Sequence, residues 1–182
     1  MYKKLTLVLM LLFSRHVMAD GFYLSSADVQ GQISTDQVFN GFGCSGKNIS
    51  PQLSWKNAPA GTKSFAITVY DPDAPTGSGW WHWVVFNIDK SVDNLKTGAS
   101  SSGDGKQAMP AGAVESVTSY GTKGFGGACP PPGDKPHRYI FTAYALDVEK
   151  LDIDAAARAE LIGFNLNSHA IAKASIMAYH GR

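Results

Sequence analysis

The sequence has little excess charge of either sign. Its 16 Lys and Arg residues nearly balance 15 Asp and Glu residues, so the formal net charge is +1 over 182 residues, and no run of basic residues stands out. Such a chain lacks the positive field that attracts nucleic acids or anionic lipid surfaces. With 44% hydrophobic and 17% charged residues, the composition is typical of a globular domain and not of a disordered chain.

Long hydrophobic runs are missing as well. The apolar stretch at 5–13 is too short for a permanent membrane-spanning helix. It follows two lysines and precedes Ala19, which is the pattern of a secretory signal peptide. We expect cleavage after Ala19, with Gly21 as the second candidate, and a mature domain over 20–182. Loss of residues 1–19 removes three basic residues and no acid, which changes the net charge from +1 to −2. The expected location is the periplasm or the outside of the cell, with a buried core strand as the alternative for 5–13.

Motifs of common hydrolases and metal enzymes are also absent. The sequence contains no Gly-x-Ser-x-Gly, no His-x-x-x-His and no His-x-His. No nucleophile with an adjacent base can be identified. We therefore expect no catalytic residues, no cofactor and no metal site, and a hydrolase or metal enzyme is the least favoured alternative.

Cysteine is scarce, since Cys44 and Cys129 are the only two. In an exported protein, a pair of cysteines predicts a disulfide. This bridge would close a loop of about 85 residues, which is worth roughly 4–5 kcal/mol in the chain-entropy description. Two free thiols or a pair of metal ligands are the alternatives.

What the sequence does contain is a series of short apolar runs separated by glycine and proline, a pattern typical of strands. We expect strands over 63–70, 80–88 and 139–146, the last beginning at or just after His137. Period-two alternation puts His82 on one face with Val84, Phe86 and Ile88, and it puts His137 on one face with Tyr139 and Phe141.

The remaining segments predict loops and small helices. Residues 97–136 are rich in Gly, Ser and Pro and predict long loops. A helix is expected over 154–163, capped by Asp154 and ended by Gly163. Residues 170–179 predict a last strand or a short helix. The fold class is mainly β, an antiparallel β-sandwich with one or two small peripheral helices.

Four polar residues lie at the ends of the expected strands. Asp71 and Asp73 flank a proline directly after one strand, His82 lies near the start of the next, and His137 begins a third. Taken singly, the acidic pair is a common turn and His82 a common core residue. Strand ends that meet at one rim of a sandwich are, however, where loops build binding sites.

Two imidazoles beside two carboxylates suit three kinds of chemistry. They could bind an anion while the acids orient the imidazoles, hold zinc or manganese, or perform acid–base catalysis. The missing motifs favour the anion. Trp80 is either packing or part of the pocket mouth, and Arg138, which points away from His137, predicts a structural salt bridge or a bond to loop carbonyls.

Several motifs together resemble the phosphatidylethanolamine-binding family, which includes the Raf kinase inhibitor protein, and most closely its periplasmic bacterial members. They are N-I-S-P-Q-L-S-W at 48–55, Y-D-P-D-A-P at 70–75, W-H-W-V-V-F-N-I at 81–88, G-F-G-G-A-C-P-P-P-G at 124–133 and H-R-Y at 137–139. Their order and spacing cover most of residues 22–180.

The resemblance implies a β-sandwich with Greek-key links and a cavity that accepts phosphate-like or carboxylate anions. The matching positions that line the cavity are Asp71, Asp73, His82, Cys129, Pro130, Pro131 and His137. A C-terminal tyrosine lines it in some members, for which Tyr179 is the candidate here, and a one-residue shift would put His180 there. Cys129 replaces a glycine of animal members, so the disulfide would pin the rim of the cavity.

These observations favour a regulatory binding module for a small anionic or phosphate-bearing ligand. The alternative is a regulator of other proteins, similar to kinase or protease inhibitors, that acts in the envelope or on a host protein. By analogy with bacterial relatives, a homodimer is expected.

Overall fold

The structure is a computed structural model that describes residues 21–100, 102 and 107–182. The expected signal peptide at 1–19 therefore lies outside the described residues. The elements, in chain order, are β1 (Tyr23–Ser25), β2 (Asn40–Gly41), β3 (Cys44–Ser45), β4 (Leu53–Lys56), β5 (Ser64–Asp71), β6 (Trp80–Asp89), β7 (Asn94–Leu95), β8 (Val114–Glu115), β9 (His137–Leu146), α1 (Ala159–His169) and β10 (Ala170–His180). The segment at 170–179, which the sequence left open, is thus part of the strand β10.

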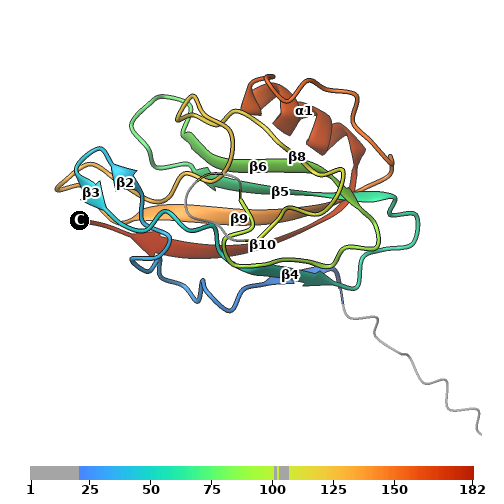
Figure 1. The fold of residues 1–182 in the computed structure, drawn as a ribbon, viewed down its shortest axis with the longest axis horizontal. Coiled ribbons are helices and arrows are strands. Elements are labelled where there is room, and N and C mark those ends of the chain that lie inside the picture. The colour runs from blue at the N-terminus through green and yellow to red at the C-terminus, as the bar shows by residue number, and fades with distance from the viewer. Residues whose placement is uncertain (1–20, 101, 103–106) are drawn as a thin grey trace, which may run out of the picture.

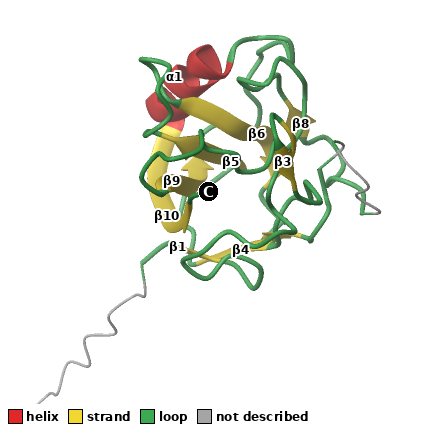
Figure 2. Cartoon of the chain, turned by 90° about the vertical axis from the view of Figure 1, so that its left-hand side faces the viewer, coloured by secondary structure: helices red, strands yellow, loops and turns green. Residues whose placement is uncertain are grey.

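The strands form a sandwich of two antiparallel sheets and a small hairpin. The larger sheet has the order β10-β9-β5-β6-β8, the smaller one has the order β1-β4-β7, and β2 pairs only with β3. Figure 2 shows three layers, with the small sheet on one side of the large sheet and α1 on the other. In Figure 1 the hairpin of β2 and β3 lies at one end of the molecule, beside the chain's C-terminus. The predicted mainly-β sandwich is confirmed, with one helix among the described residues.

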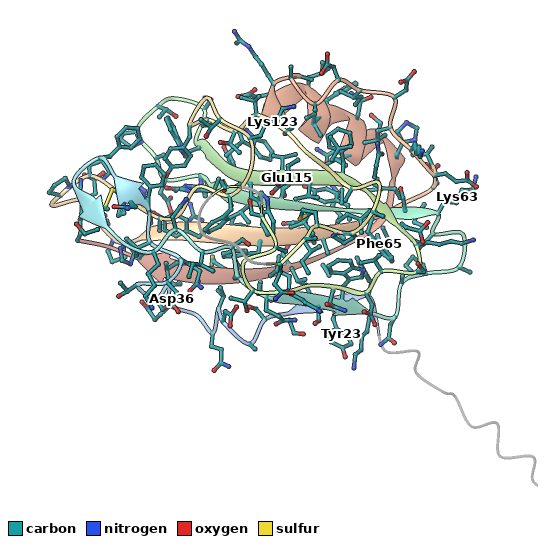
Figure 3. All side chains as sticks on the ribbon, in the orientation of Figure 1. Tyr23, Asp36, Lys63, Phe65, Glu115 and Lys123 are labelled. Atoms are coloured by element: carbon teal, nitrogen blue, oxygen red, sulfur yellow. A yellow bond between two sulfur atoms is a disulfide. The ribbon has the colours of Figure 1, made fainter. Side chains whose placement is uncertain are left out.

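Each face of the large sheet has its own hydrophobic cluster. Between the sheets, Phe65 packs against Trp55, with ring centroids 5.4 Å apart, and Figure 3 shows Phe65 between β5 and β4. Under the helix, Val84 and Phe86 pack with Ile162 and Leu166. Because both faces are covered, nearly every residue of β5 is buried.

The helix begins later than predicted. Residues near Asp154 form a turn instead, in which the Ala156 amide donates to the Asp154 carboxylate over 2.8 Å. The buried residues of α1 are Ala159, Ile162, Gly163 and Leu166, a spacing that makes one apolar stripe. Gly163 lies inside the helix, where an added Cβ would come within 3.2 Å of the Trp81 ring. The glycine therefore allows close packing of α1 on the sheet and does not end the helix.

The predicted face of His82 is also wrong, because β6 contains two bulges. Val69 pairs with Trp83 and Tyr70 with Trp81, so His82 is an extra residue on its strand. A second register shift follows near Asn87, whose φ is +57°. Val84 and Phe86 consequently face the helix, whereas His82 faces the space between the sheets, where it contacts Tyr139. The bulge is what turns this imidazole toward the candidate site.

Candidate ligand-binding site

A cavity of about 210 Å³ opens where β5 ends and where β6 and β9 begin. Three strands and four loop segments contribute to its wall. The lining residues are Phe42, Asp71, Ala74, Pro75, Thr76, Trp80, His82, Tyr120, Cys129, Pro130, Pro131, His137 and Tyr139. The wall is mostly aromatic and apolar with a few converging polar groups, which is the usual character of a small-molecule site.

Asp71 and His137 form a buried pair in this wall. The His137 Nδ1 atom lies 2.7 Å from Oδ2 of Asp71, and both side chains are about 4% exposed. The other carboxylate oxygen, Oδ1, accepts the backbone N–H groups of Asp73 and Ala74 over 2.8 and 3.2 Å. Because a carboxylate only accepts hydrogen bonds, Nδ1 of His137 carries the proton. Asp71 thereby fixes both the tautomer and the orientation of this imidazole.

The second nitrogen of His137 faces another acid. Its Nε2 atom lies 3.3 Å from Oδ2 of Asp134, a side chain that is 40% exposed. Since Nδ1 already carries a proton, Nε2 can donate to Asp134 only in the imidazolium form. His137 thus sits between one buried and one solvated carboxylate.

His82 has one satisfied and one unsatisfied nitrogen. Its Nδ1 atom lies 2.7 Å from the carbonyl oxygen of Gly126, so Nδ1 donates. Its Nε2 atom is buried and has no hydrogen-bond partner. Burial lowers the pKa of His82 to about 4, because desolvation disfavours the charged imidazole. At neutral pH this side chain therefore presents an unused acceptor at Nε2.

Two tyrosines surround His82. The Tyr139 ring meets the imidazole edge-on at 5.0 Å, and its hydroxyl is also buried without a partner. The Tyr120 ring lies 5.6 Å from the imidazole, and its hydroxyl donates to the carbonyl of Gly127 over 2.7 Å. Burial raises the pKa of both phenols, which keeps them protonated. The Tyr139 hydroxyl is therefore an unpartnered donor, and its ring contacts the imidazole that carries the unpartnered acceptor.

Asp73 does not line the cavity. Its carboxylate receives two bonds from the Arg138 guanidinium, over 2.9 and 2.6 Å, and one from the Arg138 backbone N–H over 2.8 Å. The Arg138 side chain lowers the pKa of Asp73 to about 2. The salt bridge expected of Arg138 is confirmed, and its partner is the acid that the sequence assigned to the pocket.

The other predicted site residues also differ in whether they line the cavity. Asp71, Trp80, His82, Cys129, Pro130, Pro131 and His137 all line the one cavity. Tyr179 instead lines a neighbouring hollow with Asp73 and Arg138, and His180 lines neither hollow. The reason is that Arg138 and its strand partner Tyr179 point to the opposite side of the sheet from His137.

Three aromatic residues of the cavity wall, Phe42, Tyr120 and Tyr139, were not among the predicted site residues. Tyr139 was expected on the same strand face as His137, and this was sufficient reason to predict it as a site residue. Phe42 lies two residues before Cys44, so the expected disulfide could have placed it near Cys129. Tyr120 lies in a loop without periodicity, and nothing in its sequence context indicates a pocket.

The predicted disulfide is confirmed. Cys44 and Cys129 are bridged, with Cα atoms 6.0 Å apart and a separation of 85 positions in sequence. The bridge joins the β2–β3 hairpin to the cavity wall at Cys129, and Figure 3 shows its yellow bond beside that hairpin.

Two further observations concern metals and membranes. Within the described ranges, no group of three or more His, Cys, Asp or Glu side chains is arranged to hold a metal ion. The one helix in that same part of the chain is too short to cross a bilayer.

Comparison with known proteins agrees with this geometry. The sequence profile described as "Phosphatidylethanolamine-binding protein" matches residues 27–181. The UPF0098 protein YbcL of Escherichia coli K12 is 51% identical over 160 residues, which are 87% of this chain and 86% of YbcL. The UPF0098 protein YbhB of the same strain is 53% identical over 141 residues, 78% of this chain and 87% of YbhB.

A solved structure extends the similarity to three dimensions. The crystal structure of E. coli YbcL, described as a member of the mammalian PEBP family, superimposes with a TM-score of 0.85 and 48% identity over 90% of this chain and 99% of that one. With the profile match and these relatives, the chain belongs to the phosphatidylethanolamine-binding protein family.

Proposed function

We propose that this protein is an extracytoplasmic binding module whose cavity accepts the oxyanion of a small phosphate-like ligand. The observation that carries the proposal is the pair of buried, unpartnered polar atoms, Nε2 of His82 and the hydroxyl of Tyr139. Buried polar groups in proteins are nearly always hydrogen-bonded, and both of these unused atoms belong to residues that line the cavity, which supports a hydrogen-bonding ligand there. The Tyr139 hydroxyl would donate to one ligand oxygen.

The contact with His82 depends on protons. A neutral Nε2 accepts a hydrogen bond, so it suits an oxyanion that still carries a proton, such as a singly protonated phosphate. A fully ionised oxyanion would instead stabilise the imidazolium form, and Nε2 would then donate. In both cases one proton is shared between His82 and the ligand, and the ligand would bind more tightly as the pH falls toward the pKa of His82.

Binding, and not catalysis, is supported by the state of the other lining groups. The Thr76 hydroxyl donates to the carbonyl of Gly79 over 2.6 Å, and the sulfur of Cys129 is held in the disulfide. Neither is activated by an adjacent base, as a nucleophile requires. We infer a regulatory role in which ligand occupancy, not turnover, is the output.

The extracytoplasmic location rests on two features. The disulfide is the kind of bond that persists in oxidising compartments. The first 19 residues have the pattern of an export signal. We propose a periplasmic or secreted protein on this basis.

Thermal unfolding with sulfate, phosphate and a chloride control of equal ionic strength tests the proposal. A ligand at 100 times its Kd adds about 2.7 kcal/mol to the stability of the folded state, or roughly 5–10 °C in Tm for a domain of this size. His82→Gln and Tyr139→Phe should each abolish most of this shift. His169→Gln, on the exposed end of α1, is the matched control and should retain it. Equal shifts in all variants, or no shift in the wild type, would refute the proposed site.

A further inference from the structure

The turn between β2 and β3 has an unusual residue at its tip. Gly41 pairs with Cys44, so Phe42 and Gly43 form a two-residue hairpin loop. Both have positive φ, +52° and +82°. Turns of this type favour Asn-Gly because a bulky residue is strained at positive φ. Phenylalanine thus occupies a position that its backbone disfavours.

The same side chain lacks the usual compensation of burial. Phe42 is 68% exposed, so burial in the core does not offset its backbone strain. Phe42 nevertheless lines the cavity. Strained, exposed residues of this kind cluster where a ligand is clamped.

A disulfide and the hydrogen bonds of Arg182 hold the hairpin against the cavity wall. The disulfide joins Cys44 to Cys129 of the wall. The Arg182 guanidinium donates to the carbonyl of Phe42 over 3.2 Å and to that of Pro130 over 2.6 Å. Both contacts therefore connect the turn directly to the cavity-lining segment at Cys129 and Pro130.

The ring of Phe42 continues an aromatic wall. It stacks on Tyr120, with centroids 5.8 Å apart and an interplanar angle of 15°. Tyr120 in turn meets Trp80 edge-on at 5.3 Å. These three rings line the cavity together with His82 and Tyr139, so an oxyanion at His82 would have its substituent among aromatic faces.

We propose that Phe42 is a specificity-determining residue that makes the cavity prefer oxyanions carried on an apolar group over those carried on a polar one. This inference rests on the proposed oxyanion site and adds the chemical class of the rest of the ligand. The ring supplies contact area to an apolar substituent and none to a bare ion. The disulfide and Arg182 keep it in place in the absence of ligand, so little ordering cost is left for binding.

Calorimetric titration with three probes tests this. Phenyl phosphate and glycerol 3-phosphate are monoesters of similar charge that differ in the polarity of their substituent, and inorganic phosphate has no substituent. The wild type should bind phenyl phosphate about three- to tenfold more tightly than glycerol 3-phosphate, the range expected of one aromatic contact. Phe42→Asn should remove this preference.

The variants are chosen so that misfolding cannot mimic the result. Asparagine suits positive φ, so Phe42→Asn should fold with a Tm equal to or above that of the wild type. Phe42→Tyr keeps a ring and should keep the preference. Phe164→Ala, which removes an equally exposed phenylalanine on α1 (69% against 68%), should change none of the three affinities.

The outcomes separate this inference from the function on which it rests. Phosphate that binds through His82 while phenyl phosphate shows no advantage, or an advantage that survives in Phe42→Asn, overturns the role of Phe42 alone. Failure of all three probes to bind overturns both proposals.

Discussion

Asp71 and His137 are 66 positions apart in the chain, yet their side chains meet at 2.7 Å in the interior of the protein. The acid ends β5 and the imidazole begins β9, two strands that run antiparallel as neighbours in the large sheet. Strand pairing therefore brings the two groups together, and the cavity opens beside them. This pairing makes the Asp71–His137 pair part of the sheet framework.

Asp71→Asn tests how far the site depends on the buried carboxylate. The asparagine oxygen can still accept the two turn amides, but its NH₂ group would face Nδ1 of His137 and force the proton to Nε2. We expect a loss of about 2–4 kcal/mol in the free energy of unfolding and weaker oxyanion binding. Denaturant titration and calorimetry measure the two effects.

Asp134→Asn is the control for that substitution. Asp134 also contacts His137, but at 3.3 Å and from a partly exposed position, so its removal should cost less than about 1 kcal/mol. If the two variants lose equal stability, burial of the Asp71 pair is not what matters.

Asp73→Asn should behave differently, although the two acids are separated by a single proline. Its partner is Arg138, outside the cavity, so oxyanion affinity should stay within about twofold of the wild type. The pKa of Asp73 is lowered from 3.8 to about 2. A depressed carboxyl pKa stabilises the fold above pH 3.8, and this stabilisation is lost as the pH falls through 2.

Acid unfolding of the two proteins measures this contribution. The wild type should be more stable than Asp73→Asn at pH 5, and the difference should shrink between pH 4 and pH 2. A loss of ligand affinity in Asp73→Asn would instead place this acid in the site, as its sequence motif suggested.

Much of the site could be predicted because sequence patterns report strand ends. Alternation predicted β5 and β9, and residues at the ends of neighbouring strands, such as Asp71 and His137, meet at one rim. The orientation of His82 could not be obtained this way. One extra residue in β6 reverses the face of His82. The local sequence does not indicate this bulge, because the register of β6 is determined by packing on both sides of the sheet.

Long-range packing also explains the other errors. The family resemblance placed both Asp71 and Asp73 in the cavity, but Pro72 separates them in a turn, and Asp73 pairs with Arg138 of another strand. The helix was placed too early because Asp154 and Gly163 resemble a cap and a stop. Their roles in the fold are a turn and a close contact with Trp81, which depend on neighbours distant in sequence.

Removal of the disulfide should lower the stability of the protein strongly. A bridge across 85 positions restricts the unfolded chain, and the double variant Cys44→Ala with Cys129→Ala should lose about 4–5 kcal/mol. Urea unfolding under non-reducing conditions measures the loss. Wild-type protein treated with a reductant should match the double variant, and a difference below about 1 kcal/mol would mean that the hairpin is held by its other contacts.

The last prediction concerns pH and His82. Burial lowers its pKa to about 4, whereas in an unfolded chain a histidine titrates near 6.5. Between these pH values the unfolded state binds a proton at His82 and the folded state does not. The free energy of unfolding therefore falls as the pH is lowered from about 6.5 to 4, by on the order of 3 kcal/mol in total. Above pH 6.5 this contribution is constant.

His82→Gln should flatten that part of the stability profile, and His169→Gln should leave it as in the wild type. Sulfate provides a second, independent test because it does not titrate in this range. An anion bound at Nε2 stabilises the imidazolium and raises the pKa of His82, so saturating sulfate should reduce the slope in the wild type and have no effect on the slope in His82→Gln. A slope that sulfate leaves unchanged in the wild type would mean that the anion does not reach this nitrogen.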